Sequence, residues 1–158
     1  MLKVTPEQRA NLLKLADYLY ALPDNYEKFH MGTFATQESK DELFGLLELD
    51  PSNVLEGLHN CGTTACAIGH GPACGIKPEP LDLTWGRYAD RAFGADLNSR
   101  VFNFCFAGAW EEYDNTPKGA AQRIYYLLDN GIAGLTEPLA KRDFMQMYQH
   151  LTPNITRK

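Results

Sequence analysis

The chain contains 158 residues, of which 44% are hydrophobic and 22% charged, and its formal net charge is −5. This length is typical of one domain with a substantial core, and 8 Tyr, 8 Phe and 2 Trp argue against intrinsic disorder. No apolar run approaches the roughly 20 residues that cross a bilayer, so we expect no membrane partner. The charged N-terminal segment is unlike a secretory signal peptide. We therefore expect a globular cytoplasmic protein, in which four cysteines do not form a disulfide framework.

Acidic and basic residues are distributed unevenly along the chain. Residues 1–80 carry 6 basic and 11 acidic side chains, whereas residues 81–158 carry 9 of each. Non-specific nucleic-acid binding depends on neutralising phosphates, so the acidic balance disfavours bulk nucleic acid as a partner. The acidic first half is consistent with a solvated face or with a surface that meets a basic partner.

The first predicted helix begins after Thr5. Thr5 and Gln8 have the spacing of a capping box, and Pro6 occupies the favoured first helical position. Apolar residues spaced by three and four define its inner face, which Leu13 and Tyr20 would broaden. The members of that inner face are Leu12, Leu15, Ala16, Leu19 and Leu22.

Two short helices are predicted next. One follows Ser39, with Leu46 and Leu47 among its apolar residues. The other, of about two turns, is capped by Thr63 or Thr64 and ends near His70. Pro72 is expected to push Gly71 out of the helical region and so to stop it. Its small residues suit a central, largely buried position.

The second half of the chain predicts further helices. Thr84 caps a helix over 85–93 that Gly94 ends, and Thr116 caps one that ends near Asn130. Residues 97–106 fit both helical and strand periods, and we favour a helix; a last helix is predicted over 138–150. The sequence thus predicts an all-α protein, a single compact domain of five to seven short helices with irregular connectors, spanning 1–151 and followed by a polar tail at 152–158.

The sharpest local feature is a group of soft metal ligands within fourteen residues: Cys61, Cys66, His70 and Cys74. Zinc sites use four such donors in a tetrahedral array, so a small zinc-stabilised domain is one interpretation. The segment contains no CxxC pair, and the residues between the four candidate ligands are mostly small and apolar. Both features favour packing in the core without a cofactor.

A phosphate-bearing ligand is a second interpretation. Helix N-termini attract anions, and the candidate ligand-binding residues are Thr63, Thr64, Arg87, Trp110, Lys118 and Arg123. Ordinary helix capping explains the same threonines, and neither segment is a phosphate-binding glycine loop.

No catalytic residue is assigned from the sequence. Cys61 lies two positions from His59, but no flanking signature of a cysteine protease is present, and the adjacent Glu111 and Glu112 are expected to point apart into water. We therefore lean towards a protein that is not an enzyme.

Two segments resemble those of a group of small uncharacterised proteins from bacteria and their phages. They are Cys61–His70, with the sequence CGTTACAIGH, and Asn115–Ile124, with the sequence NTPKGAAQRI. The resemblance implies an accessory protein of a phage or mobile element, working in the bacterial cytoplasm. By analogy, such a protein engages or inhibits a host protein, for example a defence factor, or sequesters a small nucleotide-like immune signal.

Overall fold

A computed structural model describes residues 4–23, 29, 35–38, 46–48, 51, 63–97, 99–106 and 116–131 of the chain. The predicted last helix at 138–150 and the tail at 152–158 lie outside these residues, as do Cys61 and Trp110. None of the described helices is both long and apolar enough to cross a membrane.

Helix α1 spans Pro6–Tyr20 and begins as predicted. Thr5 Oγ1 accepts a hydrogen bond from the Gln8 amide at 3.1 Å, and Gln8 Oε1 accepts one from the Thr5 amide at 2.9 Å. This capping box satisfies two backbone donors at the helix start. Four of the five predicted inner-face residues are fully buried, namely Leu12, Leu15, Ala16 and Leu19.

The prediction that Leu13 and Tyr20 broaden the buried face of α1 is wrong. Leu13 is 47% exposed and Tyr20 is 44% exposed. Both residues lie outside the stripe formed by Leu12, Leu15 and Leu19, which suffices to cover the core side of the helix.

The helical predictions for the second half are confirmed within the described residues. Helix α3 spans Trp85–Phe93, α4 spans Arg100–Cys105 and α5 spans Pro117–Asn130. Thr84 caps α3 and Thr116 caps α5 through their hydroxyl oxygens. Gly94 ends α3 in the left-handed conformation, with φ of 64°, which glycine adopts without a steric penalty.

The middle of the chain differs from the predicted helices. Strands β1 (Ala35–Glu38), β2 (Leu46–Glu48) and β3 (Thr63–Ala65) form an antiparallel sheet in the order β2-β1-β3, and Thr36 pairs with both Glu48 and Thr64. Leu46 and Leu47 therefore lie in a strand. Thr63 and Thr64 also extend a strand and do not cap a helix, in keeping with the strand preference of β-branched residues.

Only a short helical turn follows β3. It is a 3-10 helix over Ile68–His70, succeeded by a second over Pro72–Cys74. The first ends at His70 as predicted, but Gly71 keeps helical dihedrals of φ −53° and ψ −50°. Glycine lacks the Cβ atom that contributes to the clash with a following proline ring, so the predicted expulsion of Gly71 from the helical region does not occur.

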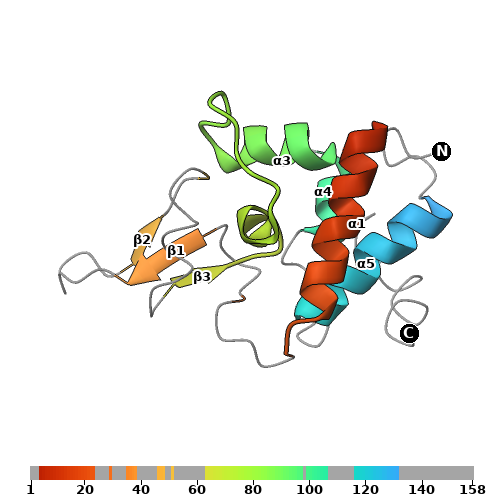
Figure 1. The fold of residues 1–158 in the computed structure, drawn as a ribbon, viewed down its shortest axis with the longest axis horizontal. Helices are drawn as coiled ribbons and strands as arrows, with labels where there is room; N and C mark the ends of the chain where they lie inside the picture. Colours follow the sequence, from red (N-terminus) through yellow and green to blue (C-terminus); the bar gives the residue numbers. More distant parts are fainter. Residues whose placement is uncertain are drawn as a thin grey trace.

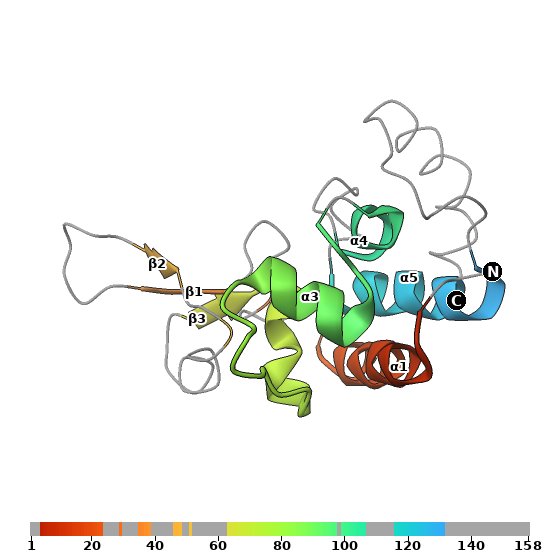
Figure 2. The ribbon, with the colours of Figure 1, turned by 90° about the horizontal axis from the view of Figure 1, so that it is seen from above.

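Within the described residues, α1, α3, α4 and α5 supply most of the core. Figure 1 shows the sheet at one end of the molecule and α1 and α5 side by side at the other, and Figure 2 shows the same arrangement from above. Helix α1 packs against both α5 and α3, and α4 packs against α5. The predicted helical character is thus confirmed for this part of the chain, with a small sheet added beside it.

Candidate functional site

The described members of the Cys/His group do not gather around a common point. Cys66 and His70 are buried, and His70 Nδ1 donates a hydrogen bond to the Cys66 carbonyl oxygen at 2.8 Å. Cys74 Sγ instead donates to the Gly71 carbonyl oxygen at 3.1 Å. Within the described residues, no three His, Cys, Asp or Glu side chains are placed to hold a metal ion. The described part of this segment, which includes Cys66 and His70, therefore packs in the core.

The environment of Cys66 also opposes reactivity. Burial raises the pKa of its thiol to about 11, despite the backbone hydrogen bonds that act in the other direction. Because the thiolate is the nucleophile and the metal ligand, a thiol that stays protonated at neutral pH suits packing.

The predicted anion-binding residues are dispersed. Thr63 and Thr64 lie in β3, Arg87 is exposed on α3, and the Lys118 ammonium lies 5.9 Å from the centre of the Tyr20 ring. The side chain of Arg123 is fully buried in the core, so it is out of reach of a ligand at the surface. The described residues thus lie on three different elements, β3, α3 and α5.

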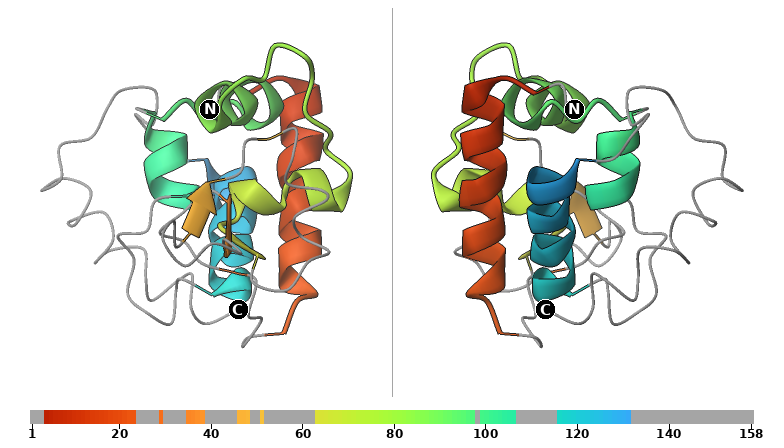
Figure 3. Two further views of the ribbon diagram at one scale, coloured as in Figure 1. Left: turned by 90° about the vertical axis from the view of Figure 1, so that its left-hand side faces the viewer. Right: turned by 90° about the vertical axis from the view of Figure 1, so that its right-hand side faces the viewer.

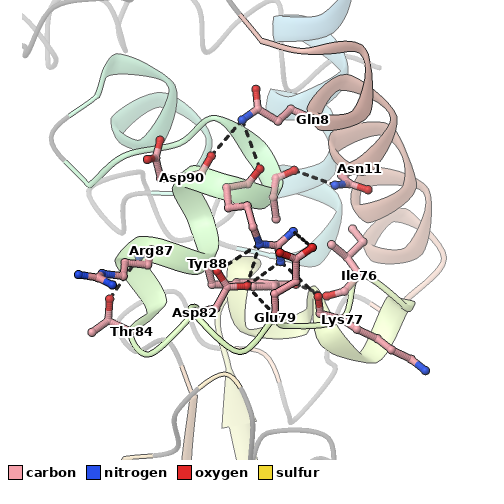
Figure 4. A network of polar contacts seen from close by, with 12 residues as sticks. Gln8, Asn11, Ile76, Lys77, Glu79, Asp82, Thr84, Arg87, Tyr88 and Asp90 are labelled. Atoms are coloured by element: carbon pink, nitrogen blue, oxygen red, sulfur yellow. Dashed lines mark hydrogen bonds and ion pairs between the residues drawn. The ribbon is translucent and has the colours of Figure 1, made fainter.

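The segment before α3 is held by a polar network drawn in Figure 4. The Arg91 guanidinium donates to the Asp82 carboxylate from Nη2 at 2.6 Å and from Nε at 2.8 Å, and Nη2 also donates to the Lys77 carbonyl oxygen. Asp82 accepts a further bond from the Glu79 amide at 2.8 Å. Tyr88 fixes the start of the segment through a 2.6 Å bond to the Ile76 carbonyl oxygen. This network ties residues 76–82 to α3.

The charge state of Asp82 follows from the same contacts. Burial alone would raise the pKa of its carboxyl, but the hydrogen bonds from Arg91 and Glu79 outweigh burial and hold the pKa below its usual value. The Asp82 side chain is 3% exposed and the Arg91 side chain 29% exposed. The ion pair is therefore a buried clamp with one edge open to water.

This clamp presents two leucines to solvent. Leu81 is 77% exposed and Leu83 is 69% exposed, and they stand on either side of the buried Asp82. The residue between them is turned into the protein, whereas both leucine side chains lie in solvent. Exposed single leucines are common on soluble proteins.

A concave surface lies between α1 and α5. A cleft of about 350 Å³ is lined by Pro6, Arg9, Ala10 and Leu13 of α1 and by Tyr125, Leu128 and Asp129 of α5. The two helices run antiparallel, as the right-hand view of Figure 3 shows. Five of these seven side chains are apolar or aromatic, and the two charged ones are Arg9 and Asp129.

Polar contacts between the helices hold the cleft in shape. Arg9 Nη2 donates to the Leu128 carbonyl oxygen at 2.9 Å, which satisfies one of the free carbonyls in the last turn of α5. Tyr125, which also lines the cleft, donates a hydrogen bond from its hydroxyl to Asp17 Oδ1 at 2.6 Å. These bonds fix the separation of α1 and α5 along the cleft.

Sequence reasoning missed this surface. The available signal was the spacing of Leu13 and Tyr20, which are seven residues apart and thus share a face of α1. Their assignment to the core obscured a second apolar stripe on the same helix.

Comparison of the chain with protein-family models, with curated proteins and with solved structures gives no match.

Proposed function

We propose that this protein acts by binding another protein, without catalysis, through the cleft between α1 and α5. In the setting implied by the sequence resemblance, the partner is a bacterial host protein and the chain is an accessory protein of a phage or mobile element. The observation that carries the proposal is the apolar lining of the cleft, which includes the exposed Leu13.

The shape and rigidity of the cleft support this role. Binding energy at protein interfaces concentrates where side chains fill well-packed pockets, and the cleft between α1 and α5 offers such a pocket. The hydrogen bonds of Arg9 and Tyr125 position the two helices in advance. A preformed surface avoids part of the ordering cost of association.

The nucleotide-ligand and zinc alternatives receive no comparable support. The described residues named for the nucleotide ligand lie on three different elements, β3, α3 and α5. Of those named for zinc, His70 and Cys74 donate hydrogen bonds to backbone carbonyl oxygens. Protein binding is therefore the one function that we propose.

Site-specific photocross-linking in bacterial cells tests the proposal. A photoreactive benzoylphenylalanine replaces Leu13 in one variant and Leu83 in a control, since both leucines are exposed. We expect one dominant adduct with a cellular protein from position 13 and none of that mass from position 83. No adduct from position 13, or the same adducts from both positions, would refute the proposal.

A further inference from the structure

We draw no further inference here: the strongest candidate, the surface patch of Leu81 and Leu83 on the segment that precedes α3, is exposed, and nothing in the structure shows what covers it.

Discussion

Replacing Asp82 with asparagine tests whether the Arg91–Asp82 clamp stabilises the fold. The substitution keeps the size of the side chain but removes the charge that receives the 2.6 and 2.8 Å bonds from Arg91. Removing one partner of a fully buried ion pair costs about 3–5 kcal/mol. Arg91 is 29% exposed and can turn part of its guanidinium to water, so we expect a smaller loss, about 2 kcal/mol, close to that of one hydrogen bond to a charged group.

Urea unfolding followed by circular dichroism measures this loss. With a slope near 2 kcal/mol per molar urea, the midpoint should fall by about 1 M. Asp90→Asn is the matched control, because Asp90 lies on α3 and is exposed, and it should change the free energy of unfolding by less than about 0.5 kcal/mol.

The pH dependence of the free energy of unfolding tests the Arg91–Asp82 clamp independently. The pKa of Asp82 is lower in the folded protein than in the unfolded chain, so the stabilisation is complete above the unfolded value of about 3.9 and is lost as pH falls through the folded value. The difference between Asp82→Asn and the parent should thus be constant near neutral pH and shrink below about pH 4. Equal urea midpoints for Asp82→Asn and the parent at neutral pH would refute the stabilising role of the clamp. So would a difference in their stability that stays the same at a pH where Asp82 is fully protonated.

Three further predictions concern the helices and the buried thiols. Leu12→Ala should cost about 2–5 kcal/mol, because it opens a cavity in the core, whereas Leu13→Ala should cost less than about 0.5 kcal/mol; similar losses in urea unfolding would contradict the assignment of the two faces of α1. Gly94→Ala should cost about 2 kcal/mol, since alanine is strained at φ 64° and its Cβ would meet packed side chains; an unchanged melting midpoint would show that this turn is not left-handed. Cys66 and Cys105 should resist iodoacetamide at pH 8 until the protein is unfolded, because burial raises their pKa values to about 11 and about 12; rapid labelling of either in native protein, read by peptide mass spectrometry, would place it at the surface.

Local signals predicted the helix starts well. Thr5, Thr84 and Thr116 each cap the helix expected of them, because the capping hydrogen bond spans only three residues and depends little on the rest of the fold. The end of α3 at Gly94 has the same origin. These capping interactions join residues that are close in the sequence, so the local sequence is enough to predict them.

The pairing of strands that are distant in the chain could not be predicted from the sequence. Thr64 pairs with Thr36, 28 positions away. The residues of neither segment indicate which other segment it pairs with. A short apolar stretch such as Leu46–Leu47 suits a helix or a strand equally, and the sheet partners decide between them. The small residues near Cys66 predicted burial correctly but not the strand that precedes it.

The cleft was missed for a related reason. Hydrophobicity alone assigned Leu13 to the core, although Leu12, Leu15 and Leu19 already fill the inner face of α1. The sequence shows two apolar stripes on this helix, and only the placement of α5 shows which one is covered.

The accessibility of position 13 tests the central claim most directly. With Leu13→Cys, the introduced thiol should react rapidly with a maleimide in the isolated protein, as measured by peptide mass spectrometry. Addition of the purified partner, identified beforehand by photocross-linking, should protect the thiol. Slow labelling in the isolated protein would contradict the open cleft between α1 and α5. Unchanged labelling in the complex would contradict binding through that cleft.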